Sequence, residues 1–267
     1  MNKSLLALAV SGLLVFAQTA QAGVSATVTA ASDYTFNGVS QTGNDPALQG
    51  SLDYAADSGW YMGTWASNVD FGPGEDTNLE WDFYVGQYFQ LTDVVSLDAG
   101  IAYYTYHGDD ASSDYKYPEV YTKFGFANDL GQTELNFWYS WDYFGVEADH
   151  YIAMIAHTFT IDLGQTELNF WYSWDYFGVE ADHYIAMIAH TFTIAEGHDI
   201  RISFDRSTSM DEDLYSWDNS ASYNHVRIAY MTSYAGFDFT LAAEDTSMDI
   251  DSADARIVFS VARTFGG

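Results

Sequence analysis

The sequence predicts an all-β protein, a transmembrane antiparallel up-and-down β-barrel of about 14 strands. Three observations lead to this prediction. Apolar and polar residues alternate along many segments of roughly ten residues, the connections between these segments are alternately short and long, and the chain begins with an export signal. An outer-membrane barrel combines these three features.

The alternation is clearest at residues 78–91, NLEWDFYVGQYFQL. Trp81, Phe83 and Val85 share one parity, whereas Glu80 and Asp82 share the other. A period of two is typical of a strand with one apolar and one polar face, and a helix would place both acids across the apolar stripe. By the same pattern we expect strands near residues 24–37, 47–56, 60–69, 78–91, 94–106, 118–127, 133–144, 150–161, 166–177, 183–194, 198–206, 220–232, 237–244 and 254–265.

The connections fall into two classes. After each even-numbered strand comes a tight turn, such as Asp57-Ser58-Gly59 or Thr92-Asp93, and after each odd-numbered strand a longer acidic loop, such as STSMDEDLYSWDNS. Outer-membrane barrels have short periplasmic turns and longer external loops. A soluble barrel or sandwich would show the same alternation, but the export signal and the 18% aromatic content favour the membrane barrel.

The two ends predict an exported single-domain protein. Residues 1–22 have a basic start, an apolar run of about a dozen residues and a small-residue cleavage site, as a signal peptide does. An anchor helix is the alternative, but the run is short of the ~20 residues needed to span a bilayer. Residues 23–267 then form one barrel domain, which lacks Cys and therefore disulfides. Its last segment, RIVFSVARTFGG, resembles the terminal strand that outer-membrane assembly machinery recognises.

The charge limits the partners. The chain has 38 acidic residues against eight Lys and Arg, a formal net charge of −30, which would repel nucleic acid. Disordered chains are also acidic, but they are poor in aromatic residues. We therefore expect a folded protein of the bacterial outer membrane, in contact with membrane lipids and lipopolysaccharide.

Residues 129–161 are repeated without change as residues 162–194. Each copy holds two alternating segments joined by GVEAD, which predicts one β-hairpin per copy. An added hairpin preserves the even strand count and widens a barrel. We therefore expect a twelve-stranded parent and a fourteen-stranded product; the alternative is that one copy is looped out of the wall.

If the apolar parity faces lipid, the polar parity faces the lumen. The pore-lining candidates are Glu80, Asp82, Asp98, Glu119, Glu134, Asp142, Glu167, Asp175, Arg201, Arg227 and Arg256. The acids lie on the fourth to ninth strands and the arginines on the eleventh, twelfth and fourteenth. Acids on one wall and arginines on the other would set a transverse field across a pore. The alternative is that opposite charges pair and fill the interior.

Other chemistry has weaker support. Tyr84, Tyr88, Tyr104, Trp138 and Trp171 could stack on an organic cation, although filling of the interior explains them equally well. The loop SMDEDLYSWDNS holds possible Ca²⁺ ligands but lacks the EF-hand spacing. No nucleophile elbow, zinc motif or phosphate-binding loop occurs. We expect no enzyme activity, no metal and no cofactor.

Residues 32–70 resemble the TorF-type porin family of exported bacterial proteins. The shared segments are Ser32-Asp33-Tyr34, Phe36-x-Gly38-x-Ser40-Gln41 and Gly59-x-Tyr61-x-Gly63-x-Trp65-Ala66-Ser67-Asn68. Asn37 departs from the pattern, because members commonly carry Arg between that Phe and Gly. The resemblance implies an outer-membrane barrel of the porin type and carries over no catalytic residues.

Together these features predict a porin-like channel for passive diffusion of small hydrophilic solutes. Acidic loops would concentrate cations at its mouth, so we expect a preference for small polar or cationic solutes. The alternative is a non-conducting barrel with a structural or adhesive role.

Overall fold

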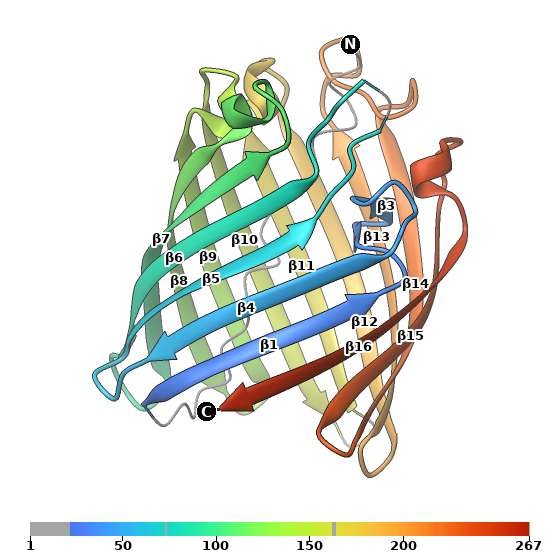
Figure 1. Ribbon diagram of the computed structural model, residues 1–267. Helices are drawn as coiled ribbons and strands as arrows, with labels where there is room; N and C mark the ends of the chain where they lie inside the picture. Colours follow the sequence, from blue (N-terminus) through green and yellow to red (C-terminus); the bar gives the residue numbers. More distant parts are fainter. Residues whose placement is uncertain (1–21, 73, 162–163, 267) are drawn as a thin grey trace.

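The computed structural model describes residues 22–72, 74–161 and 164–266, and it is a closed barrel of fourteen antiparallel strands (Figure 1). Each strand pairs with its sequence neighbour in the barrel, and β1 closes the wall against β16. The predicted fold class is confirmed. The barrel strands are β1 (Gly23–Ala31), β4 (Ala47–Ala55), β5 (Trp60–Asn68), β6 (Leu79–Gln90), β7 (Val95–His107), β8 (Tyr117–Asn128), β9 (Gly131–Trp141), β10 (Asp149–Ile161), β11 (Gly164–Trp174), β12 (His183–Ala195), β13 (His198–Ser209), β14 (Ser222–Tyr234), β15 (Phe237–Thr246) and β16 (Arg256–Gly266).

Short elements lie in the connections. Strands β2 (Thr35–Phe36) and β3 (Val39–Ser40) form a separate two-stranded sheet in the first loop. Single 3₁₀ turns occur in four other loops: η2 (Ser112–Tyr115), η3 (Tyr143–Gly145), η4 (Tyr176–Gly178) and η5 (Asp251–Ala253). Among the described residues no helix is long and apolar enough to cross a membrane.

The wall has an apolar outer face and a mixed inner face. On β6, Trp81, Phe83 and Val85 are exposed, whereas Glu80 and Tyr84 between them are buried. The same alternation leaves an apolar residue exposed at every second position on most strands. So much exposed apolar surface is unfavourable in water and favourable in lipid. The protein is therefore a transmembrane barrel of the bacterial outer membrane.

Connection length gives the barrel its direction. The tight turns gather at one end and the long loops at the other, which is the upper end in Figure 1. Strand β1 starts and β16 finishes at the short-turn end, as expected for the periplasmic side. The predicted signal peptide falls almost wholly on residues 1–21, outside the described residues.

Both copies of the repeat contribute a hairpin to the wall: β9 with β10, and β11 with β12. Their internal registers are the same, since Phe159 pairs with Gly131 in the first copy and Phe192 with Gly164 in the second. The copies join through eleven paired positions of β10 and β11. Neither copy is looped out; the twelve-stranded parent stays a hypothesis.

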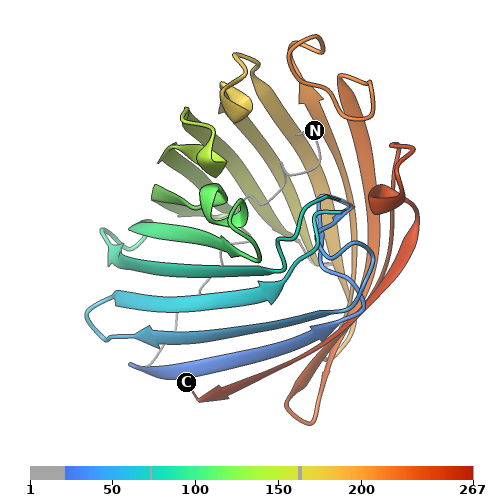
Figure 2. The ribbon, with the colours of Figure 1, turned by 45° about the horizontal axis from the view of Figure 1, so that its top comes forward.

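Three expected strands end at least three residues earlier than predicted. The first strand of the chain ends at Ala31 instead of residue 37. The first strand of each copy, β9 or β11, ends at Trp141 or Trp174 instead of residue 144 or 177. Beyond the copies' strands, Asp142 and Asp175 have φ angles of 98° and 48°, in the left-handed region, which breaks an extended ladder. After Ala31 the chain turns into the barrel, and Figure 2 shows this first loop inside the rim.

Candidate functional site

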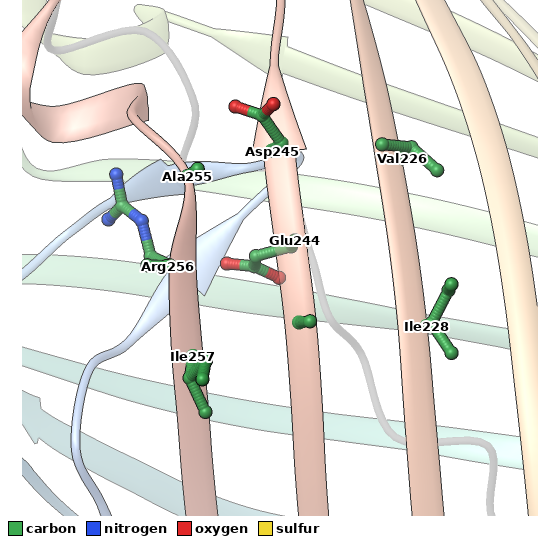
Figure 3. A pocket seen from close by; sticks show the side chains of 8 residues that line it. Val226, Ile228, Glu244, Asp245, Ala255, Arg256 and Ile257 are labelled. Atoms are coloured by element: carbon green, nitrogen blue, oxygen red, sulfur yellow. The ribbon is translucent and has the colours of Figure 1, made fainter.

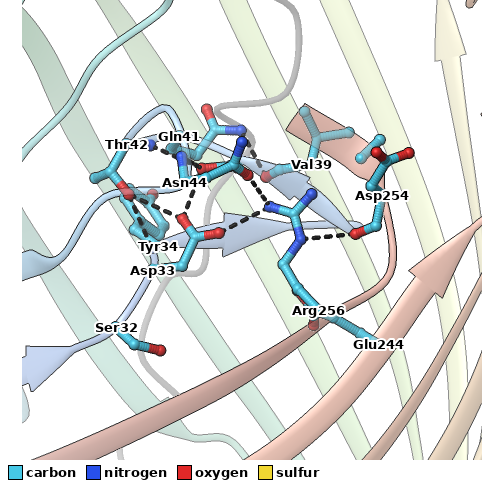
Figure 4. A network of polar contacts seen from close by, with 12 residues as sticks. Ser32, Asp33, Tyr34, Val39, Gln41, Thr42, Asn44, Glu244, Asp254 and Arg256 are labelled. Carbon is cyan, nitrogen blue, oxygen red and sulfur yellow. Dashed lines mark hydrogen bonds and ion pairs between the residues drawn. The ribbon is translucent and has the colours of Figure 1, made fainter. Parts of the chain in front are cut away.

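The candidate site is the lumen, and its most distinctive part is the inward-folded first loop, residues 32–46. Asp33 in this loop, which is 6% exposed, accepts hydrogen bonds from Ser40 Oγ at 2.6 Å and Thr42 Oγ1 at 2.9 Å. Arg256 Nη1 on β16 donates to the other Asp33 oxygen at 2.8 Å and to Asn44 Oδ1 at 2.8 Å (Figure 4). The ion pair therefore ties the loop to the barrel wall.

The loop also packs tightly against the wall beside it. Val39 is 2% exposed within an apolar cluster that includes Trp217, Tyr223 and Met248. At Gly38, whose φ is +81°, an added Cβ would lie 2.6 Å from His225 Cδ2 and closer still to Thr246. Only glycine suits this approach. The glycine of the family signature is thus the point where the loop touches β14 and β15.

On β11 to β16 the lumenal arginines are paired with carboxylates. Arg201 donates to both oxygens of Glu167, at 3.1 and 2.7 Å, and so bridges from β13 across β12 to β11. Arg227 Nε lies 3.0 Å from Glu244 Oε2 on β15. This wall is thus locally neutralised, which corrects the expectation of an arginine wall facing an acidic one. Charge pairing, the alternative reading, describes this part of the lumen.

His225 adds to this paired region. Its Nδ1 lies 2.8 Å from Asp205 Oδ2 and its Nε2 lies 3.9 Å from Glu244 Oε2. All three side chains are buried, directly beneath Gly38 of the inward loop. The histidine therefore links two carboxylates under the loop.

On β4 to β8 the lumenal carboxylates are held by tyrosines. Tyr106 donates to Glu80 at 2.8 Å and Tyr104 donates to Glu119 at 3.3 Å. In the same way Tyr61 donates to Asp98 and Tyr84 to Asp53. A tyrosine hydroxyl satisfies a carboxylate without neutralising it. This half of the lumen therefore holds more acidic than basic side chains.

Aromatic rings fill much of the external half of the lumen. Contacts run from Tyr106 to Phe144 (5.0 Å between ring centroids) and from Tyr143 to Phe177 (5.1 Å). They continue from Tyr176 to Tyr215 at 4.9 Å, and onward through Trp217 and Tyr223 to the wall under the first loop. The rings of η3, in the first copy, and of η4, in the second copy, are part of this layer. Together with the first loop it narrows the mouth.

The structure places nine of the eleven pore-lining candidates on the inward parity of their strands: Glu80, Asp82, Asp98, Glu119, Glu134, Glu167, Arg201, Arg227 and Arg256. Asp142 and Asp175 are not on the wall, and their prediction as strand residues is wrong. Each lies past its strand at the start of an external loop and accepts the backbone N–H of Glu147 or Glu180. A carboxylate that accepts a nearby N–H favours a turn over a strand.

Several lumenal charges were not among the candidates: Asp33, Asp53, Lys123, Asp205, His225 and Glu244. Most of them sit on the polar parity of a predicted strand, so the same alternation rule would have found them. Asp33 also has the polar parity of the strand predicted over residues 24–37, but that strand ends at Ala31, and Asp33 reaches the lumen from a loop.

The external loops lie outside the membrane-spanning strands. In the loop before β8 the Ser112 hydroxyl and backbone N–H both donate to Asp109, at 2.8 Å, and lower the pKa of that carboxyl. Burial, together with a hydrogen bond to Glu75, raises the pKa of Tyr115 to about 12. In the part of the chain that the structure describes, no three His, Asp or Glu side chains gather to hold a metal.

A hollow of about 510 Å³ lies on the wall at β14, β15 and β16 (Figure 3). Ala243 pairs with Ile228 on one side and Ile257 on the other, so a small residue between two large ones leaves a depression. Ile257 is 71% exposed there. These three side chains belong to the lipid-facing parity, so the hollow opens on the outer face of the wall, although Glu244 and Arg256 of the inner parity also line it.

Comparison with solved structures supports the fold. A bacterial polysaccharide outer membrane secretin matches with a TM-score of 0.52 and 7% identity, over 91% of this chain and 98% of its own. A porin (TM-score 0.49, 8% identity, 92% and 99% covered) and an outer membrane channel from Pseudomonas putida F1 (0.45, 10%, 92% and 96%) are also similar. The secretin match shows a likeness of fold, and at 7% identity it extends no further. No curated protein sequence matches the chain.

The sequence itself matches one family profile, described as bacterial protein of unknown function (Gcw_chp), over residues 17–170. The match covers more than half of the chain and includes the whole signature of residues 32–70, with the inward loop and its Asp33 and Gly38. The resemblance predicted from that signature is confirmed, and the chain belongs to this family of bacterial proteins.

Proposed function

We propose that the protein is a cation-preferring channel for passive diffusion of small hydrophilic solutes across the outer membrane. The observation that supports the proposal is the excess of acidic over basic side chains on the inner face of the wall. Asp53, Glu80, Asp98 and Glu119 are held by tyrosines on one wall, whereas the arginines of the other wall are each taken up by an acid. Charges in a low-dielectric tube act on passing ions with little screening.

The size of the solute follows from the mouth. The first loop and the aromatic layer both occupy the external half of the barrel, so only small solutes would pass. We therefore propose small polar or cationic molecules, without a named solute. We assign no enzymatic step to the chain, and we propose that the assembly machinery binds β16 and that lipopolysaccharide contacts the external loops.

The repeat also bears on the channel. The second copy adds two strands, and it supplies Glu167 as the partner of Arg201. Glu134 of the first copy instead accepts hydrogen bonds from the side-chain amides of Gln132 and Asn136, at 3.2 and 3.3 Å, and forms no ion pair within the described part of the chain. We propose that the added hairpin widens the lumen and leaves it one carboxylate more negative.

The test is the reversal potential of the folded mature protein in a planar bilayer under a KCl gradient. We expect discrete conductance steps with a cation-selective reversal potential. Glu134→Gln removes a lumenal carboxylate and should lower the selectivity measurably, whereas Asp213→Asn removes an exposed loop carboxylate and should lower it less, because solvent screens the loop. Anion selectivity, or equal effects of the two variants, would contradict the proposal.

One observation favours a second function. The ring packing of the external half is tight, with Tyr106, Tyr117 and Tyr143 each 1% exposed. A lumen closed by this layer would leave a non-conducting barrel with a structural or adhesive role. A folded protein that is silent in bilayers at all voltages would support this alternative over the channel.

A further inference from the structure

One lumenal base differs from the others in its surroundings. Arg201, Arg227 and Arg256 each form an ion pair, at 2.7, 3.0 and 2.8 Å. Lys123 on β8 shares the inner face with Glu119 and Tyr121, yet forms no ion pair with any residue that the structure describes. Its ammonium lies instead 4.9 Å from the centroid of the Tyr121 ring and 6.0 Å from that of Trp138.

The wall around this ammonium is fixed by register and hydrogen bonding. Tyr121 and Trp138 are direct cross-strand partners, and Lys123 pairs with Asp98 on one side and Asn136 on the other. Tyr61 bonds to the hydroxyl of Tyr121 at 2.6 Å and also donates to Asp98. Trp138 is 9% exposed. Two aromatic faces and a carboxylate are thus held in place around a positive head group.

This arrangement has the chemistry of an ammonium-binding site. A ring face attracts a cation, and the attraction is strongest for a cation that loses little hydration, as an alkylated ammonium does. Small alkali ions keep their water and gain less from rings. The side chain of Lys123 occupies this site with an ammonium of its own, tethered by a flexible stem.

We propose that Tyr121, Trp138 and Asp98 form a lumenal subsite for organic ammonium ions in transit, with Lys123 as its tethered competitor. This inference deepens the proposed function and rests on it for the transit. A passing ammonium would displace the lysine head from the rings. Lys123 would therefore set how strongly the channel retains such solutes.

The test measures equilibrium binding of tetramethylammonium chloride to the folded full-length barrel in detergent, by titration calorimetry. Lys123→Met removes the ammonium that lies near the Tyr121 and Trp138 rings. The variant should bind tetramethylammonium roughly tenfold more tightly than the wild type, because the ligand no longer competes with the lysine for the ring faces. Lys116→Met is the matched control, since Lys116 is exposed in an external loop and its loss should leave the affinity unchanged. Lys123→Gln serves as a second vacating variant, should Lys123→Met fold poorly.

Two further variants test the rings. Added to Lys123→Met, Trp138→Leu should abolish the gain, whereas Trp171→Leu, the same residue in the second copy, should retain it. Vacated variants that bind no more tightly than the wild type would overturn the subsite, and so would an equal gain for sodium. The two proposals fail in different ways. If the protein conducts no current in KCl but Lys123→Met still binds tetramethylammonium more tightly, only the channel is contradicted. If the protein conducts but Lys123→Met binds no more tightly than the wild type, only the subsite is contradicted.

Discussion

The hairpin of residues 129–161 and its copy at 162–194 have the same sequence and the same internal register, but different neighbours. The first copy lies beside β8 and the second beside β13. On the outer face the environments stay alike: Thr133 bonds to His157 at 2.8 Å, and Thr166 bonds to His190 at 2.7 Å. On the inner face they diverge.

Glu134 and Glu167 are equivalent residues of the two copies with different partners, and strand register explains the difference. Thr191 of the second copy pairs with Arg201, and Glu167 reaches this arginine across β12. The equivalent residue of the first copy, Thr158, pairs with Glu167 itself. By register, the position that Arg201 occupies relative to Glu167 is therefore occupied, relative to Glu134, by Glu167 itself.

The two tryptophans differ in the same way. Trp138 pairs with Tyr121 and lies near Lys123, whereas Trp171 pairs with Met154 and is more exposed. Inward side chains of neighbouring strands lie close enough to interact across the sheet. The lumenal chemistry of a strand is thus a property of the strand and its neighbours together, which an identical sequence does not fix.

Removing one copy is the strongest way to break this comparison. A variant lacking residues 162–194 should fold as a twelve-stranded barrel in which Glu134 takes Arg201 as its partner. Barrel diameter grows about linearly with strand number, so the cross-section should fall by about a quarter. Single-channel conductance should fall by at least that fraction, with weaker cation selectivity. Unchanged conductance would mean that the second hairpin does not widen the pore.

Truncating the two tryptophans separates their environments. Trp138→Ala should lower the free energy of unfolding by roughly 3 kcal/mol, because it leaves a cavity among buried rings. Trp171→Ala should cost about half as much, since its side chain is less buried. Urea unfolding in lipid vesicles gives both values. Equal losses would show that the hairpins are energetically equivalent despite their neighbours.

Neutralising Glu134 or Glu167 should give the smallest difference in stability between the two copies. Glu167→Gln leaves Arg201 without its two-fold ion pair and should lower the free energy of unfolding by roughly 1–2 kcal/mol, a value reduced because both side chains are about a quarter exposed. Glu134 forms no ion pair within the described part of the chain, and in Glu134→Gln the amide oxygen can still accept from a neighbouring amide, so this change should cost under about 0.5 kcal/mol. Adding Arg201→Met to Glu167→Gln should restore stability. No recovery in that double variant would place the loss elsewhere.

The alternation of residue types located every barrel strand and its lipid-facing side, because a strand between lipid and lumen must change polarity at each residue. Strand ends were less predictable. Asp142 and Asp175 continue the polar parity of their strands, yet both adopt a left-handed conformation and begin a loop. The binary pattern carries no information about local hydrogen bonds that a carboxylate accepts from a nearby backbone N–H.

The direction of the first loop was beyond the pattern altogether. The alternation predicted residues 32–37 as the end of the first strand and left residues 38–46 as a connection, and the contact of Gly38 with His225 joins positions far apart in the chain. Asp33 and Arg256 meet only because β1 closes against β16. Such contacts depend on closure of the whole wall.

By itself the sequence determined the class of fold, the membrane it suits, the strand count and the two faces of each strand, because these follow from the local alternation of polarity. Only the tertiary structure decided which charges are neutralised, which rings surround Lys123 and how the first loop narrows the mouth. These depend on strand register and barrel closure, which bring residues distant in sequence to one level of the lumen. The repeated hairpin is the direct demonstration, since one sequence has two different lumenal surroundings.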